Sequence, residues 1–399
     1  RKVQARLDRV LGMTRENLTG VRVLRAFGRE EEQKREFSAR NDALTKEQNH
    51  VGRISVLLNP VTYVIINLAI VALIRTGALR VESGALSQGD VIALYNYMSQ
   101  ILVELIKLAN LVLNITRAVA CCNRIGAVLE IESSQHSPQT EPETTADAPA
   151  IEFRRAGLRY AGAGGDALDG ISFRAEKGQT IGVIGGTGSG KTTLINLIPR
   201  FYDATEGSVL VDGVPVEQYP LESLRRRIGV VPQKAVLFHG TIRENLLWGD
   251  PDAGDGTLRE ALRAAQAEEI VQGKEGGLDF EIEQGGRNLS GGQRQRLTIA
   301  RALVRKPEIL IFDDSFSALD YKTDAVLREG LAKQLPGTTK IIVAQRISTI
   351  RNADQILVLD RGEIAGLGTH DELMVSCPGY REIAMSQLSE EELKGGDAR

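Results

Sequence analysis

The sequence has 399 residues, with 49 lysines and arginines against 52 aspartates and glutamates, and 42% of its residues are hydrophobic. This length allows two or three domains. A net charge of −3 excludes a protein whose main task is to neutralise nucleic-acid phosphates, so we expect no nucleic-acid partner. The three cysteines have neither disulfide nor metal-ligand spacing, and we expect reduced thiols on a cytosolic side.

The first 130 residues are predicted to be helical and to enter a membrane. After a charged helical stretch, residues 57–74 form 18 residues without a charge, which is close to the minimum for crossing the hydrocarbon layer. A buried core helix is the alternative, but the length favours a membrane span. We expect Pro60 to lie in the first helical turn, where its missing N–H costs least.

A second, less apolar helical stretch runs from about residue 90 to residue 130, after a polar connection with three glycines (Gly77, Gly84 and Gly89). Glu104 and Lys107 share a helix face there. They would face a cavity or pair with each other in a membrane, whereas a cytosolic helix would tolerate them equally well. Lysines and arginines crowd residues 1–53, so the positive-inside rule puts both outer ends in the cytosol. The predicted membrane helices are about 55–76 and 90–117.

The segment 131–150 is rich in Pro, Ser, Thr and Glu, which predicts a flexible linker and a domain boundary. Beyond it, short strand-like runs alternate with helical segments. This pattern predicts an α/β domain over residues 151–390, with a mainly parallel sheet, an antiparallel layer at its start and a hairpin turn at 360–362. Residues 391–399 are expected to form a flexible tail.

Residues 185–193 read GGTGSGKTT and match the phosphate-binding pattern G-x-x-x-x-G-K-[ST] between a predicted strand and helix. Glycines let backbone N–H groups face phosphates, and the helix start adds a positive dipole end. Lys191 would contact the β and γ phosphates, and the Thr192 hydroxyl would bind Mg²⁺. The predicted ATP-binding residues are Gly185, Gly186, Thr187, Gly188, Ser189, Gly190, Lys191, Thr192 and Thr193.

Three further motifs follow. Residues 309–314 read ILIFDD, a buried strand that would deliver Asp313 beside the phosphate loop as a second Mg²⁺ anchor. Residues 289–296 read LSGGQRQR and residues 317–320 read SALD. Ser290 can cap the helix that follows it, and a glycine-rich helix start can also face an anion.

Together these motifs resemble the ATP-binding cassette (ABC) family over about residues 151–387. The resemblance implies an α/β P-loop (RecA-like) nucleotide-binding domain with antiparallel β and α-helical subdomains, preceded by an all-α transmembrane segment. It implies that Tyr160 stacks on adenine, that Gln233 contacts Mg²⁺ and senses the membrane domain, and that Asp320 communicates across a dimer of cassettes. In such a dimer the signature residues act on the partner's ATP; here they are Ser290, Gly291, Gly292 and Gln293.

The N-terminal part resembles exporter-type members of this family. Residues 16–31, ENLTGVRVLRAFGREE, look like the cytosolic docking loop after the fourth membrane helix. The two predicted spans then correspond to the fifth and sixth helices, and the chain, which does not begin with Met, is expected to lack the first four. The resemblance implies a subunit of the cell (inner) membrane whose nucleotide-binding domain lies in the cytoplasm.

Two positions depart from the family pattern. Asp314 replaces the glutamate that polarises the attacking water; its carboxylate is one methylene shorter, and a displacement of about 1 Å can cost about a hundredfold in rate. Gln345 replaces a histidine, and an amide can donate a hydrogen bond but cannot carry a proton or a charge. We therefore expect a site that binds ATP and Mg²⁺ but hydrolyses ATP weakly.

A weak site predicts a heterodimer, in which the signature of this chain completes a competent site on a non-identical partner. A homodimeric exporter with two slow sites and a non-transport cassette ATPase acting on DNA or ribosomes are the alternatives, and import through an exporter-like fold is also open. The cargo, whether drug, lipid or another amphiphile, is not encoded in the motifs. The four histidines are scattered and predict no metal site.

Overall fold

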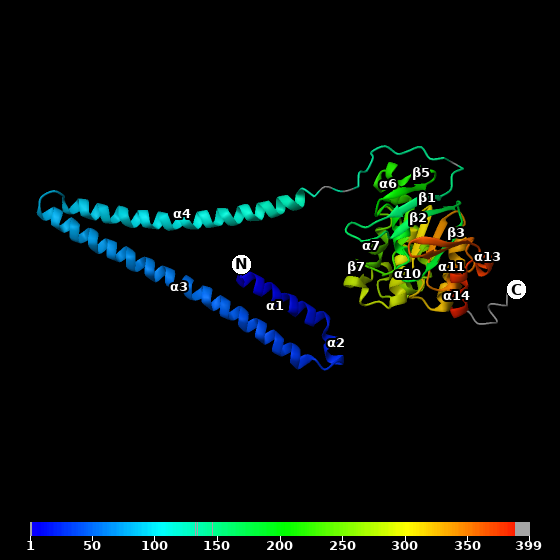
Figure 1. Ribbon diagram of the computed structural model, residues 1–399, viewed down its shortest axis with the longest axis horizontal. Helices are drawn as coiled ribbons and strands as arrows, with labels where there is room; N and C mark the ends of the chain where they lie inside the picture. Colours follow the sequence, from blue (N-terminus) through cyan, green and yellow to red (C-terminus); the bar gives the residue numbers. More distant parts are fainter. Residues whose placement is uncertain (1, 132, 134, 146, 388–399) are drawn as a thin grey trace. The chain divides into compact units, whose positions relative to one another are not determined.

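The computed structural model describes residues 2–131, 133, 135–145 and 147–387. The chain forms two compact units, Arg1–Glu132 and Ser133–Arg399 (Figure 1). The predicted tail at 391–399 lies outside the described residues.

Helices are the regular elements among the described residues of the first unit. This unit contains α1 (Lys2–Thr19), α2 (Val21–Ala26), α3 (Glu30–Glu82) and α4 (Gln88–Leu129). Helix α1 packs on the first part of α3, where Val10, Met13 and Leu44 are buried and Arg6 pairs with Glu47 at 3.2 Å. Helices α3 and α4 form a hairpin (Figure 1).

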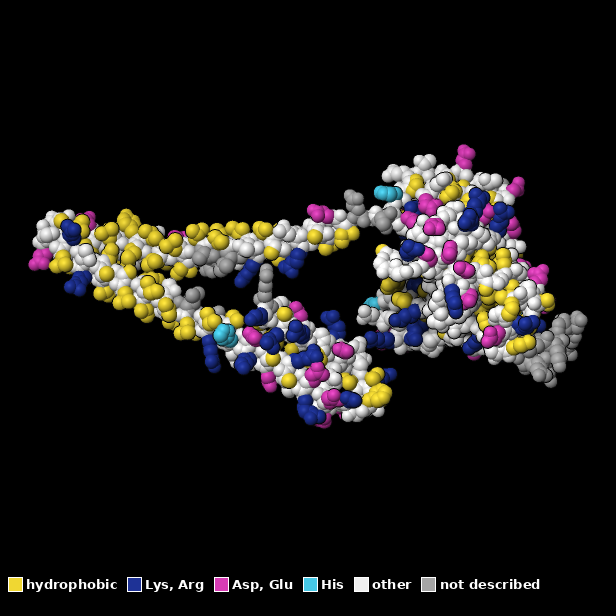
Figure 2. Space-filling model, in the orientation of Figure 1, with side chains coloured by type: hydrophobic (Ala, Val, Ile, Leu, Met, Phe, Trp, Pro, Cys, Tyr) yellow, Lys and Arg dark blue, Asp and Glu magenta, His cyan; other side chains and the backbone are white. Residues whose placement is uncertain are grey.

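The hairpin carries the apolar surface of this unit. The segments Pro60–Glu82 and Gln88–Leu108 are long and apolar enough to cross a membrane. Figure 2 shows hydrophobic side chains covering this end of the hairpin, whereas charges of both signs gather on α1, α2 and the start of α3. Exposed apolar surface of this extent fits lipid or neighbouring helices rather than water. Glu104 and Lys107 form an ion pair of 2.8 Å along α4, so they pair with each other as one alternative expected.

Two local predictions for the hairpin are wrong. Pro60 does not begin a helix but lies inside the 53-residue α3. The connection is also shorter than predicted, because Gly77 lies in α3 and Gly89 in α4, while Gly84 turns the chain with φ +74°. Gly77 permits close helix packing, since a Cβ there would lie 2.8 Å from Cγ1 of Val91.

A capping box sets the start of α4. The Asp90 N–H donates to the Ser87 hydroxyl at 3.2 Å, and the Ser87 N–H donates to the Asp90 carboxylate at 2.8 Å. These two bonds satisfy N–H groups that would otherwise lack partners at the helix start. The polar residues after Ser83 are therefore divided between a short turn and the first turn of α4.

The second unit contains two main sheets. The antiparallel sheet has the order β2-β1-β4-β5, from β1 (Ile151–Leu158), β2 (Leu168–Ala175), β4 (Glu206–Val211) and β5 (Val214–Pro215). The larger sheet has the order β12-β11-β3-β10-β9-β6 and is parallel except for β12. Its strands are β3 (Thr180–Gly185), β6 (Ile228–Val231), β9 (Ile309–Asp313), β10 (Thr339–Val343), β11 (Gln355–Asp360) and β12 (Glu363–Gly368).

This architecture confirms the predicted mixed α/β class with a mainly parallel sheet, an early antiparallel layer and the hairpin at 360–362. A small ribbon, β7 (Gly240–Thr241) with β8 (Glu281–Ile282), accompanies the helices. The helices are α5 (Lys191–Leu197), α6 (Leu221–Arg227), α7 (Ile242–Leu247), α8 (Asp255–Ala264), α9 (Glu268–Gln272), α10 (Gly291–Val304), α11 (Tyr321–Gln334), α12 (Ile347–Ile350), α13 (His370–Ser376) and α14 (Pro378–Gln387). Three short 3-10 turns occupy 216–218, 277–279 and 284–286.

Two apolar cores hold this unit together. One lies between the two sheets and includes Phe153, Ile181 and Ile311. The other lies on the helical side of the large sheet and includes Phe312 and Tyr380. Strand β9 serves both cores, because its side chains alternate between the faces. The sheet that carries the site is thus buried on both faces, as parallel sheets usually are.

The segment 131–150 has no helix or strand among its described residues, but it is not free of the domain. Gln135 donates to the carbonyl of Arg200 at 3.1 Å, and Glu141 pairs with Arg227 at 3.1 Å. The Thr145 N–H donates to the carbonyl of Asp212. This part of the segment therefore lies along the edge near α6, in contact with the ATP-binding domain.

Candidate nucleotide-binding site

The site lies where neighbouring parallel strands end. Strand β3 leads into the phosphate loop, β9 ends at Asp313, and β10 lies between them and leads to Gln345. Carboxyl ends of parallel strands share one edge of a sheet, and ligands of open α/β sheets bind at that edge. The topology therefore brings three sequence motifs, each more than thirty residues from the next, to one place.

Glycines give the phosphate loop its shape at two positions. A Cβ on Gly185 would lie 2.2 Å from the carbonyl oxygen of Leu359. Gly190 has φ +98°, and a Cβ on it would lie 2.8 Å from the carbonyl oxygen of Ala167. Gly186, Thr187 and Gly188 form the exposed tip of the loop, and Ser189 is buried beneath it. The loop can therefore present backbone N–H groups to an anion at the start of α5.

The Lys191 ammonium lies along the inside of this loop. It donates to the carbonyls of Gly185 and Gly186, both at 2.7 Å, and to the Ser189 hydroxyl at 3.4 Å. Burial lowers the pKa of Lys191, and the nearby carboxylates of Asp314 and Asp313 oppose that shift. Carbonyl oxygens are weak partners for a desolvated ammonium, so an incoming phosphate can compete for it.

Thr192 and Asp313 form a pair of hard oxygen donors. The Thr192 hydroxyl lies 3.3 Å from each carboxylate oxygen of Asp313. Burial raises the pKa of Asp313, and its hydrogen bond from Thr192 opposes that shift. Mg²⁺ prefers oxygen ligands and commonly takes one carboxylate together with substrate phosphates and water. The residues present fit a Mg²⁺–nucleotide complex, and the predicted anchors Thr192 and Asp313 are adjacent.

Two amides converge on the carboxylate of Asp314. Its Oδ2 accepts a hydrogen bond from Nε2 of Gln345 at 2.7 Å and another from Nε2 of Gln233 at 3.3 Å. Asp314 is 8% exposed and has φ +48°, an uncommon backbone conformation for a residue with a Cβ. Two exposed amide side chains therefore cover a buried, backbone-strained carboxylate beside the phosphate loop.

The remaining predicted residues lie around this centre. The Tyr160 hydroxyl donates to Thr193 at 3.1 Å, and its ring meets that of Tyr202 edge-on at 5.1 Å. Asp320 caps α11 by accepting from the Thr323 N–H at 3.0 Å, and this bond lowers the pKa of Asp320.

The signature segment forms a capping box at the start of α10. The Gln293 N–H donates to the Ser290 hydroxyl at 3.3 Å, and the Ser290 N–H donates to the Gln293 side chain at 3.0 Å. Gly291 has open space around its Cα. The predicted capping role of Ser290 is confirmed, and the glycines leave the start of this 14-residue helix uncovered.

Comparison with known proteins agrees with this geometry. Residues 168–317 match the family described as ABC transporter, and residues 1–105 match the family described as ABC transporter transmembrane region. An uncharacterized ABC transporter ATP-binding protein of Mycobacterium tuberculosis (strain H37Rv) is 43% identical over 97% of this chain and 67% of its own length. The chain belongs to the ABC transporter family.

Other relatives place this ABC transporter subunit among exporters. An ATP-dependent lipid A-core flippase of Pseudomonas aeruginosa is 34% identical over 98% of this chain and 64% of its own length. A probable multidrug resistance ABC transporter ATP-binding/permease protein of Bacillus subtilis is 36% identical over 94% and 63%. A bacterial Atm1-family ABC exporter with ATP bound superposes with a TM-score of 0.85 at 28% identity, covering 98% of this chain and 69% of that one. The chain thus combines an ABC exporter membrane region with an ATP-binding domain and spans about two thirds of these relatives.

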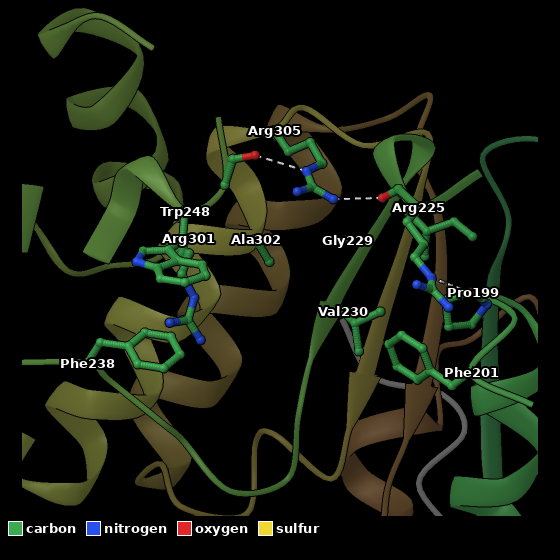
Figure 3. Close-up of a pocket in the computed structure, with 12 residues that line it drawn as sticks. Pro199, Phe201, Arg225, Gly229, Val230, Phe238, Trp248, Arg301, Ala302 and Arg305 are labelled. Carbon is green, nitrogen blue, oxygen red and sulfur yellow. Dashed lines mark hydrogen bonds between the residues drawn. The ribbon is translucent and has the colours of Figure 1, made fainter. Parts of the chain in front are cut away.

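The transporter subunit also carries a groove on its ATP-binding domain that none of the sequence motifs predicted. This groove, of about 350 Å³, is lined by residues from the turn after α5 and from α6, β6, the α7 region and α10 (Figure 3). Phe238 and Trp248 stack at 4.6 Å, and Trp248 is 61% exposed. The signal available in the sequence was this single tryptophan, in a domain whose other motifs are polar or glycine-rich.

Arginines form the polar side of the groove. Arg305 donates to the carbonyls of Gly249 at 2.9 Å and Arg225 at 2.7 Å, which joins its two rims. The guanidinium of Arg301 lies 5.9 Å from the Phe238 ring, and its buried NH1 has no hydrogen-bond partner among the described residues. Burial lowers the pKa of Arg301. A buried unpaired donor favours an acceptor supplied from outside the domain.

Proposed function

We propose that this chain is the ATP-binding subunit of a membrane exporter that couples ATP binding and hydrolysis to translocation of a drug, lipid or other amphiphile. The observation that carries the proposal is the union, in one chain, of an assembled phosphate loop and Mg²⁺ pair with an apolar helical hairpin. The relatives described as a lipid A-core flippase and a multidrug resistance transporter support an amphiphilic cargo. A cell-membrane location with the ATP-binding domain in the cytoplasm follows.

Each residue of the site has a defined task. Lys191 exchanges its carbonyl partners for β and γ phosphate oxygens, and the exposed loop tip donates backbone N–H groups to the same phosphates. Tyr160 offers an aromatic face to adenine. Thr192 and Asp313 would hold Mg²⁺ with Gln233 nearby, and the bound ion would neutralise phosphate charge.

Hydrolysis at this site is weak in the proposal because of Asp314 and Gln345. The Asp314 carboxylate is one methylene shorter than glutamate, and its Oδ2 is already occupied by two amide donors. An oxygen saturated in this way is a poor acceptor for the proton of an attacking water. Gln345 supplies no positive charge to the developing phosphate oxygens.

The signature residues of this chain would serve the ATP site of a partner subunit. Ser290, Gly291, Gly292 and Gln293 would contact ATP held by a second, non-identical subunit, whose competent site they complete. Asp320, at the start of α11, would meet that subunit as well. In this proposal the transporter is a heterodimer in which one site retains ATP and the other hydrolyses it.

The docking segment is proposed to transmit closure of the ATP-binding domains to the membrane helices. Helix α2 presents Val21 and Val23 to solvent, and Phe27 after it is 76% exposed. Exposed apolar side chains gathered in this way favour a protein contact. Closure of two ABC domains would then move α2 and the hairpin beyond it.

The experiment compares single changes in the assembled, full-length heterodimer. Asp314→Ala should leave most of the ATPase activity, whereas replacing the catalytic glutamate of the partner should abolish it. Equal losses from both changes contradict a weak site. Appreciable ATPase activity of this subunit expressed full-length without a partner would instead favour the homodimer. Recovery of the chain in the soluble fraction would favour a non-transport ATPase.

A further inference from the structure

The last residue of α14 contacts the loop that carries Gln345. Nε2 of Gln387 donates to the Gln345 carbonyl at 2.8 Å, and Oε1 of Gln387 accepts from the Ile347 N–H at 2.9 Å. One amide side chain therefore bridges the backbone on both sides of Arg346. The two residues joined lie 42 positions apart in the chain, so no local pattern could have indicated the contact.

Gln387 binds a backbone N–H that neither its own helix nor a side-chain cap at the start of that helix satisfies. Ile347 is the first residue of the four-residue α12, and the N–H groups of a first helical turn have no partner within their helix. Arg346, at the N-cap position, makes no capping hydrogen bond with its side chain. A side-chain amide of another helix therefore supplies the missing cap.

Helix α14 is itself held firmly enough to act as a support. Tyr380 and Ala384 are fully buried and belong to the same apolar core as Ile347 and Ile350. The Tyr380 hydroxyl also lies 2.8 Å from Nδ1 of His370 in α13. The position of Gln387 is thus fixed relative to α12 by packing that does not involve the nucleotide site.

The bridge continues into that site. Gln345, whose carbonyl Gln387 binds, donates its own side-chain amide to Oδ2 of Asp314 at 2.7 Å. The path runs from α14 through the Gln387 amide to the backbone of Gln345, and from the Gln345 side chain to the carboxylate beside the phosphate loop. Loss of the bridge frees the backbone that aims the Gln345 amide.

We propose that Gln387 is a positioning residue of the nucleotide site, which holds residues 345–347 so that the Gln345 amide faces Asp314 and the bound nucleotide. The assignment rests on the proposed function only for its consequence on ATP retention; the backbone bridge is independent of it. Helix α14 thereby acts on the nucleotide site through the backbone and side chain of Gln345.

The test measures amide hydrogen exchange of residues 345–350 in the full chain, purified in detergent without nucleotide. Gln387→Met removes both hydrogen bonds while keeping the side-chain length, and should raise exchange at Ile347 about tenfold. Gln387→Glu keeps an acceptor for the Ile347 N–H but not the donor to Gln345, and should give a smaller rise. Met385→Ala, on the same helix and 60% exposed, is the matched control and should change nothing.

A second readout separates positioning from mere support of the fold. Mg²⁺ and a fluorescent ATP analogue are bound to the heterodimer, and release from this chain's site is timed. Gln387→Met should speed release several-fold, with Gln387→Glu between it and wild type and with unchanged exchange in β3 and β9. Unchanged exchange at Ile347, or unchanged release despite faster exchange, overturns the proposal. Fast hydrolysis at this site would contradict the weak-site proposal yet leave the exchange result valid, so the two failures are distinguishable.

Discussion

The proposed weak hydrolysis at this site predicts that changing Asp314 and Gln345 to the family's residues makes the site competent. Asp314→Glu adds one methylene, which carries the carboxylate about 1 Å towards the water position and away from the shared contact with Gln233 and Gln345. A misplacement of that size costs about a hundredfold in rate, or about 2.7 kcal/mol of barrier. The single variant should therefore cleave ATP about a hundredfold faster than wild type at this site.

Adding Gln345→His should contribute about a further tenfold. Hydrogen bonds that involve a charged group stabilise by about 1.5–3 kcal/mol against about 1 kcal/mol for neutral ones, and the difference of about 1.4 kcal/mol is a factor of ten. An imidazolium can offer such a bond to the developing phosphate charge, whereas the amide offers a neutral one.

The assay is single-turnover hydrolysis of radiolabelled ATP by the proposed full-length heterodimer, with the partner site disabled by a Glu→Gln change. Asp252→Glu, on an exposed loop before α8, controls for the added methylene. Rapid cleavage by the wild-type site would refute the reasoning, because the two amides would then not impair Asp314. A gain of less than about threefold in Asp314→Glu would show that reach is not the limiting defect.

Three other predictions follow from contacts in the ATP-binding domain. Trp248→Ala should lower transport-coupled ATPase activity several-fold with ATP affinity unchanged, since the aromatic pair stabilises the groove by about 0.5–1.5 kcal/mol, while Trp248→Phe should retain activity. Gly190→Ala should weaken binding of the fluorescent ATP analogue at least tenfold, because φ +98° and the Ala167 carbonyl exclude a Cβ; Gly164→Ala, in open space, should not. The pKa of buried Glu152 is lowered by hydrogen bonds from Arg154 and Arg174, so its stabilisation is present above the unfolded-state pKa and is lost as pH falls through the folded-state value. Thermal unfolding of Glu152→Gln should therefore occur at lower temperature than wild type at pH 7 and approach wild type as pH falls below 4.5 towards the lowered folded-state pKa; a constant difference would contradict this.

The parts of the site that could be predicted are those defined by contiguous residues. The phosphate loop, the acid strand and the capping box at Ser290 each require particular residue types within ten positions. The alternation of short strand-like runs with helical segments indicates the parallel sheet. The adjacency of Thr192 and Asp313 then follows from the order of parallel strands.

The parts that could not be predicted depend on contacts between distant segments. Gln387 is one polar residue in an ordinary amphipathic helix, and only tertiary packing brings it to residues 345–347. The groove at Trp248 is assembled from five separate segments of the chain. The predicted position of Pro60 was wrong for another reason. A proline favours the start of a helix in water, but it is tolerated inside a membrane helix, where the backbone groups that it frees find other partners.

The unbroken length of α3 has a mechanical consequence. At 1.5 Å per residue its 53 residues extend about 80 Å, well over twice the thickness of a hydrocarbon layer. The part before Pro60 projects about 45 Å beyond the apolar segment, so a tilt of about 10° within the bilayer would sweep the far end, next to α2, through about 8 Å. Helix α3 can therefore act as a lever. A small tilt of its lipid-facing turns becomes a larger displacement of its distant end, and the helix does not need to bend.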